Sequence, residues 1–131
     1  MILAMSEATE VVEAFIAAVV SKDVAGALAL VTDDIEYDNV PMPTAHGREE
    51  TGAFLEQFGA MADEIEFVVH RQLADGDTVM NERTDRFRVA GRWIEIKVAG
   101  VFVVTGGQIS LWRDYFDLQS FTDQMAALSE A

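Results

Sequence analysis

The chain has 131 residues, enough for one domain with a hydrophobic core, and half of them are hydrophobic. Its 9 lysine and arginine residues are outnumbered by 23 acidic ones, and the resulting net charge of −14 argues against nucleic acid or an anionic membrane surface as a partner. It has no cysteine, which excludes disulfide bonds, thiol catalysis and cysteine zinc sites and suits a reducing cytoplasm.

The first thirty residues predict two helices. Ser6 can cap a helix that runs to about Val20, because the apolar residues of this stretch recur at helical spacing. Asp23 can cap a second, short helix over residues 24–31. The first ten residues lack the features of a signal peptide, and no stretch is apolar enough for a membrane span. We therefore expect a soluble, cytoplasmic protein.

The middle of the chain predicts a strand, a break and a third helix. The strand runs from about Ile35 to Val40, and the prolines and the glycine of residues 41–47 then interrupt the pattern. Residues from Arg48 to about Ala60 have the apolar spacing of a helix.

The second half of the chain changes to the period of two that is typical of strands. Four strands are expected, joined by hairpin turns and followed by a closing helix in the last dozen residues; they span 65–73, 78–90, 92–104 and 108–118. Helices followed by a run of antiparallel strands predict an α+β fold, with the helices gathered on one face of the sheet. We expect residues 1–131 to form a single domain.

Three of the strands place polar side chains on a face that also carries apolar residues. These side chains are Tyr37 and Asn39, then Arg83 and Asp85, and then Asp114, which shares its face with two aromatic residues. An unpaired buried charge is costly, so Arg83 is the obvious partner for one or both acids. If the three faces meet in one cavity, they bring together a set of groups that is suited to acid–base catalysis.

Each of these residues also has a structural explanation. Arg83 and Asp85 could form an ordinary ion pair, and Asp114 could be a solvated or capping acid near the end of its strand. Tyr37 and Asn39 could be ordinary sheet and turn residues. The local pattern by itself leaves both readings open.

Three motifs favour the catalytic reading. EYDNVPMP (36–43), NERTDRF (81–87) and GVFVVTGGQISLWRDYFDL (100–118) together resemble the limonene epoxide hydrolase family, in register from about Tyr37 to Phe121. The resemblance implies a cone-shaped fold, with a strongly curved, mostly antiparallel sheet wrapped around a deep pocket and three to four helices closing it. Nuclear transport factor 2 and ketosteroid isomerase share this fold, and the family's hydrolases are typically homodimers.

The resemblance also implies roles for the polar residues. Asp114 would be the general base that takes a proton from water, and Tyr37 and Asn39 would hold that water. Asp85 would be the general acid that protonates the epoxide oxygen, with Arg83 between the two carboxyls. The product would be a vicinal diol, formed by a hydrolase without a covalent intermediate.

The implied substrate is a small apolar epoxide in an apolar pocket. Seven residues are expected to line that pocket: Phe58, Phe67, Phe87, Ile96, Val98, Phe116 and Phe121. We expect no cofactor and no metal, because His46 and His70 are 24 residues apart with no metal-ligand spacing around them.

Two alternatives remain at this stage. The first is a ketosteroid-isomerase-like or polyketide-cyclase-like enzyme of the same fold, and Arg83 weighs against it because such a site uses one carboxylate base and neutral donors. The second is a non-catalytic module that binds a small ligand, which would not need the full polar set. The natural epoxide does not follow from the sequence, and a bulkier terpenoid, fatty or steroid epoxide fits it as well as a small cyclic one.

Overall fold

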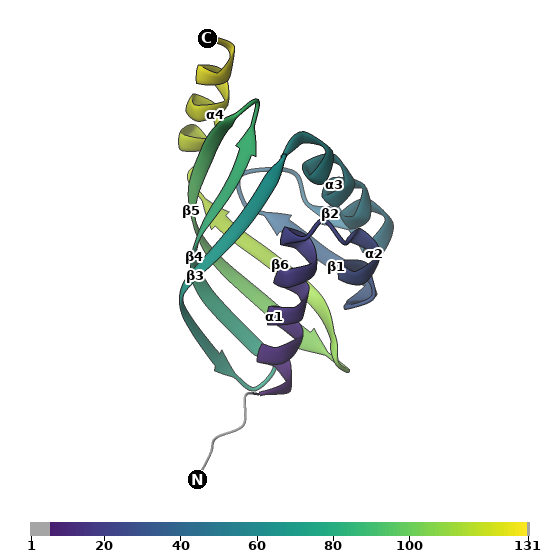
Figure 1. The fold of residues 1–131 in the computed structure, drawn as a ribbon. Coiled ribbons are helices and arrows are strands. Elements are labelled where there is room, and N and C mark those ends of the chain that lie inside the picture. Colours follow the sequence, from purple (N-terminus) through teal and green to yellow (C-terminus); the bar gives the residue numbers. More distant parts are fainter. Residues whose placement is uncertain (1–5, 131) are drawn as a thin grey trace.

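The computed structural model describes residues 6–130 of the chain (Figure 1). Residues 1–5, which belong to the stretch examined for a signal peptide, lie outside the described residues. The chain runs through α1 (Glu7–Val20), α2 (Val24–Leu28), β1 (Val31–Asn39), β2 (Ala45–His46), α3 (Gly47–Met61), β3 (Glu64–Asp75), β4 (Thr78–Val89), β5 (Arg92–Thr105), β6 (Gln108–Phe116), α4 (Leu118–Ala127) and a 3₁₀ turn (Leu128–Glu130).

The six strands form one mixed sheet in the order β2-β1-β6-β5-β4-β3. Every neighbouring pair is antiparallel except β1 and β6, which are parallel. Figure 1 shows the long strands curving, with α1, α2 and α3 gathered over the sheet and α4 beside the beginning of β5. The α+β prediction of a curved, mostly antiparallel sheet with helices around a pocket is confirmed.

Two of the helices begin at the predicted caps. The Thr9 N–H donates to Ser6 Oγ at 3.1 Å at the start of α1, and the Gly26 N–H donates to Asp23 Oδ1 at 2.9 Å at the start of α2. None of the helices within residues 6–130 has both the length and the apolar character that crossing a membrane requires.

The prediction of a helix over residues 24–31 is wrong at its end. The helix ends at Leu28, and Val31 already begins β1, four residues before the expected strand. The reason is a long-range contact, because the Ile109 N–H donates to the Leu30 carbonyl at 2.8 Å and draws the chain into pairing with β6. The two-residue strand β2, which pairs with β1, was not predicted.

The buried apolar residues form two clusters. One lies between α1 and the sheet around Phe15 and Trp112, and the other lies near α4 around Phe87 and Ile96. Phe67 packs against both clusters. Most of the buried polar residues belong to β4 and β6, and they are the start of the functional site.

Candidate active site

Strand alternation buries three charged side chains on one face of the sheet. Arg83 and Asp85 on β4 are 1% and 8% exposed, and Asp114 on β6 is 4% exposed. Strand β5 lies between β4 and β6, and its Gly100 has no side chain to separate Asp114 from the β4 side chains. Arg83 can therefore reach across β5 to an acid that is far away in the sequence.

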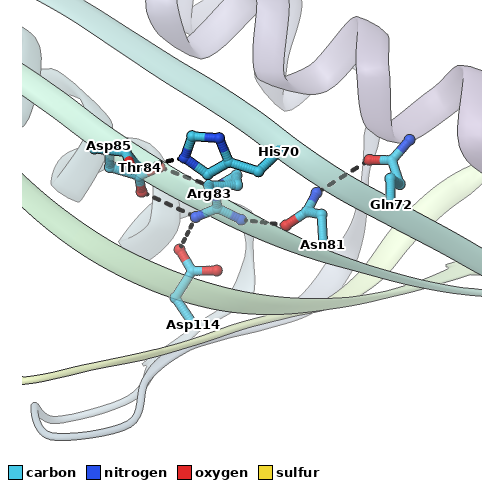
Figure 2. A network of polar contacts seen from close by, with 7 residues as sticks. All are labelled: His70, Gln72, Asn81, Arg83, Thr84, Asp85 and Asp114. Carbon is cyan, nitrogen blue, oxygen red and sulfur yellow. Dashed lines mark hydrogen bonds and ion pairs between the residues drawn. The ribbon is translucent and has the colours of Figure 1, made fainter.

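The Arg83 guanidinium holds both acids (Figure 2). Its Nε donates to Asp85 Oδ1, and its Nη2 donates to Asp85 Oδ2 and Asp114 Oδ2, each at 2.9 Å. Its Cζ also lies 5.1 Å from the ring centre of Phe67 and 5.9 Å from that of Phe102. The expected pairing of Arg83 with both carboxylates is confirmed as a contact.

Strand β1 brings a phenol and an amide to the same place. Parallel pairing sets Asn39 opposite Asp114 and Tyr37 opposite Trp112, and the Tyr37 ring stacks on Trp112 with centroids 3.8 Å apart. Asn39 Nδ2 donates to Tyr37 Oη at 2.7 Å. Among the described residues, Asp114 Oδ1 is buried and accepts no hydrogen bond.

These groups open onto an apolar cavity of about 230 Å³. All of the site residues predicted from the sequence line it except Arg83, which lies behind the two carboxyls: Tyr37, Asn39, Asp85, Asp114, Phe58, Phe67, Phe87, Ile96, Val98, Phe116 and Phe121. The three polar strand faces therefore meet in one place.

Five further lining residues were not predicted. Phe54 and Trp112 could have been found by periodicity, because each shares a helix or strand face with a predicted residue. Met42, Gln57 and Met61 are the exposed residues of the lining, so they mark its mouth. Their place depends on how α3 packs against β1 and β2, for which the sequence offers no local signal.

Burial sets the protonation properties of the acids. It raises the pKa of Asp114 to about 6, although the charge and hydrogen bond of Arg83 act in the opposite direction. Burial also raises the pKa of Asp85, again against Arg83. The pKa of Tyr37 is raised well above its usual value by burial and by the charge of Asp114. Two coupled carboxyls that titrate nearer to neutral pH can exchange protons with a ligand.

Within residues 6–130, no three histidine, aspartate or glutamate side chains are grouped so that they could bind a metal ion. The polar groups of the lining residues are two carboxyls, a phenol, two amides and the indole N–H of Trp112. Such a set can donate and accept protons on opposite sides of a small molecule.

Comparison with known proteins decides the family. Residues 6–127 match the family described as the limonene-1,2-epoxide hydrolase catalytic domain. The chain belongs to this family. It is 38% identical over 108 residues to the epoxide hydrolase EphG of Mycobacterium tuberculosis strain H37Rv, across 82% of this chain and 71% of that protein.

Solved structures agree with the family. A LEH-like epoxide hydrolase of Mycobacterium tuberculosis superposes with a TM-score of 0.81 at 35% identity and covers 94% of this chain and 95% of that one. A SnoaL-like protein of Shewanella putrefaciens CN-32 superposes with a TM-score of 0.85 at 15% identity, over 95% of this chain and 99% of that one, which shows the shared fold alone. This member of the limonene-1,2-epoxide hydrolase family is an enzyme of the epoxide hydrolase type.

Proposed function

We propose that the chain adds water to a small apolar epoxide in one step and releases a vicinal diol, with no metal or organic cofactor. The observation that carries this proposal is the state of Asp114. Asp114 lines the apolar cavity, where burial raises its pKa to about 6, and Arg83 holds its Oδ2 at 2.9 Å while the buried Oδ1 lies beside Gly100. A buried carboxylate with such a pKa, set in the wall of a cavity, is suited to act as a base.

Asn39 and Tyr37 would hold the attacking water against Asp114. Asn39 Nδ2 already donates to Tyr37 Oη, so the amide oxygen can still accept and the tyrosine hydroxyl can still donate. A water that donates to Asp114 and Asn39 and accepts from Tyr37 keeps one lone pair for the epoxide carbon. Asp114 takes its proton as the new C–O bond forms.

Asp85 would protonate the departing epoxide oxygen as the ring C–O bond breaks. It lines the same cavity, and burial raises the pKa of its carboxyl, which favours the protonated form that an acid needs. Arg83 stays charged and bonds both carboxyls, so the charge of the trio is unchanged while Asp85 loses one proton and Asp114 gains another. The proton must return to Asp85 before the next turnover.

The water itself would favour the required distribution of protons. A hydrogen bond from water to the Asp114 carboxylate stabilises the anion and lowers the pKa from about 6. Asp85 would be held in its protonated form by donating to the epoxide oxygen. Binding of water and substrate therefore favours the state in which Asp114 is ionised and Asp85 is protonated.

The shape of the cavity favours a compact substrate. Its volume of about 230 Å³ is below the roughly 300–1,000 Å³ that is usual for small-molecule sites. Phe58 of α3, Phe87 of β4 and Phe121 of α4 line it, with the rings of Phe58 and Phe87 5.1 Å apart. We therefore expect a short-chain or cyclic epoxide in preference to a steroid.

The alternative of proton transfer beside a carbonyl is less well supported. That chemistry needs one base and neutral donors, whereas here a guanidinium bonds two carboxyls. A binding module is also less well supported, because burying three charged groups costs free energy that ligand binding to an apolar cavity does not require.

The family resemblance further leads us to propose a homodimer. The outer face of the sheet carries Leu73 and Met80 opposite each other on β3 and β4, 77% and 52% exposed. A second copy would cover such apolar groups, and light scattering in solution tests this directly. The cytoplasmic location also remains a proposal from composition.

The proposed reaction is tested with a panel of short-chain, cyclic and steroid epoxides, by measuring diol formation. The Asp114→Asn variant should lose diol formation by about 10²–10⁴-fold, because the base is removed. Asp34→Asn is the matched control, since Asp34 is exposed on β1. Full activity of the Asp114→Asn variant, or no diol from any epoxide with the wild type, would refute the proposal.

A further inference from the structure

The Arg83 guanidinium has a third hydrogen-bond acceptor, which lies outside the cavity. Arg83 Nη1 donates to Asn81 Oδ1 at 2.8 Å, in addition to the contacts with Asp85 and Asp114. Asn81 is 5% exposed and does not line the cavity. Figure 2 shows it on the opposite side of the guanidinium from Asp85, so the planar group is held from three directions.

Gln72 on the neighbouring strand β3 fixes the direction of the Asn81 amide. Asn81 Nδ2 donates to Gln72 Oε1 at 3.1 Å, and the two residues pair in the β3–β4 register. With its NH₂ group engaged, Asn81 can present only its oxygen to Arg83. Gln72 in turn donates to Glu13 of α1 at 3.4 Å. The orientation of the amide is therefore set from outside the cavity.

The convergence of these side chains depends on a glycine. A Cβ atom on Gly100 would collide with Arg83 Nη1 and would lie 2.8 Å from Asp114 Oδ1 and 2.9 Å from Asn81 Oδ1. Gly100 pairs with Asn81 on one side and with Asp114 on the other. The three polar groups meet in the space that its missing side chain leaves.

Asn81 completes the cluster without adding charge. The titratable groups that face the guanidinium are Asp85 and Asp114, with Tyr37 of β1 near both. Its other neighbours are the rings of Phe67 on β3 and Phe102 on β5, and the residues of α3 and α4 that line the cavity are uncharged. One guanidinium and two acids that share one proton have no net charge. A third carboxylate would make the cluster negative.

We infer that Asn81 is a positioning residue for the acid–base pair. As a neutral acceptor it fixes the Arg83 guanidinium in the orientation that reaches both carboxyls, and it does so without a charge that would hold a proton on Asp114. This inference rests on the proposed function, but the charge on the pair can be measured without a substrate.

The Asn81→Asp variant tests the inference, because it keeps the acceptor for Arg83 and adds a charge; it also replaces the NH₂ group that donates to Gln72 by a second oxygen. The acid limb of kcat/KM should move up by about one pH unit or more, since a nearby like charge disfavours ionisation of Asp114. At pH 7, kcat should fall about twofold if the acid limb moves by one pH unit and about tenfold if it moves by two, while KM changes less than about twofold because Asn81 does not touch the cavity. Ala90→Asp is the control: it adds the same charge in the turn after β4, where a φ of 52° suits Asp, and should leave the pH profile unchanged.

A second readout separates this inference from the proposed reaction. Carbon-13 NMR titration of the Asp114 carboxyl in the wild type and both variants needs no epoxide, and the Asn81→Asp variant alone should show a raised pKa. An unshifted titration with an unshifted pH profile would overturn the inference, even if the wild type forms diol. If the wild type forms no diol, the proposed reaction is refuted. The titration of Asp114 then still decides whether the neutral Asn81 side chain controls its protonation.

The Gln72→Leu variant decides the matter if the Asn81→Asp variant does not fold. It leaves Asn81 in place and releases its NH₂ group, so the amide can turn away from Arg83. We expect kcat to fall severalfold with KM unchanged, and a wild-type kcat would overturn the inference.

Discussion

Arg83 and Asp114 form a buried ion pair across strand β5, with Nη2 and Oδ2 2.9 Å apart and side-chain exposures of 0% and 5%. The pair leaves the other oxygen of Asp114 without a hydrogen bond from any residue in the described part of the chain. The carboxyl is thus held firmly by one oxygen, and its other oxygen is buried beside Gly100. Burial of this carboxyl raises its pKa and so makes the stability of the protein depend on pH.

The stability of the protein should fall as the pH rises from about 4 to about 6. The pKa of Asp114 is about 6 in the folded protein against an ordinary value of 3.8, mainly because of burial, so in this window the folded state binds more protons than the unfolded state. The loss in free energy of unfolding is at most about 3 kcal/mol. Urea denaturation at several pH values measures it, and the Asp114→Asn variant should show a shallower dependence. Identical slopes for the two proteins would contradict the burial effect.

Removal of the Tyr37 hydroxyl should slow the reaction without weakening substrate binding. The Tyr37→Phe variant keeps the ring that stacks on Trp112 and removes a donor to the water. We expect kcat to fall about 10–100-fold, in line with the loss of one preorganised donor, with KM nearly unchanged. Tyr115→Phe is the control, because Tyr115 is 47% exposed and does not line the cavity. Equal rates in both variants would exclude the hydroxyl from the reaction.

A methyl group at position 100 should disrupt the buried cluster. In the Gly100→Ala variant the new Cβ would collide with the Arg83 guanidinium, which its hydrogen bonds prevent from moving aside. We expect a loss of about 1–3 kcal/mol in the free energy of unfolding together with a loss of activity. Gly59→Ala is the control on α3, because the nearest atoms would lie 3.8 Å from its new Cβ. Alanine in a helix should raise the free energy of unfolding by about 0.5–1 kcal/mol relative to glycine. Thermal unfolding compares them, and an equally stable Gly100→Ala variant would contradict the packing argument.

A substitution of Ala90, in the hairpin between β4 and β5, should stabilise the protein. Ala90 has a φ of 52°, which a left-handed turn requires and which asparagine tolerates better than alanine. The Ala90→Asn variant should raise the free energy of unfolding by about 0.5–1 kcal/mol, as measured by urea denaturation. Ala74→Asn, in the extended backbone of β3, should bring no such gain, and the idea fails if both variants behave alike.

The strand alternation allowed much of the site to be predicted. A period of two put Arg83 and Asp85 on one face of β4 and put Asp114 on the same face of β6 as two aromatic residues. In the structure all three are buried, and Arg83 contacts Asp114. The motifs of the limonene epoxide hydrolase family then indicated which strand faces should meet, including Tyr37 and Asn39.

Other features depend on contacts that no local pattern encodes. The parallel pairing that sets Asn39 beside Asp114 joins distant segments, and the same pairing ends α2 early by drawing Val31 into β1. Asn81 and Arg83 share one face of β4, but the space in which they meet Asp114 requires the β5 register that sets Gly100 between Asn81 and Asp114. The exposed residues of the cavity mouth, such as Met42, follow from the packing of α3 against β1 and β2.

The most direct test of the central claim is a single turnover of the wild-type enzyme with an accepted epoxide in ¹⁸O-labelled water. We predict one labelled oxygen in the diol of the first turnover, because Asp114 would activate water and would not itself attack carbon. Unlabelled diol in that turnover, with the label entering the protein carboxylate on hydrolysis, would mean a covalent ester and would contradict the proposed mechanism.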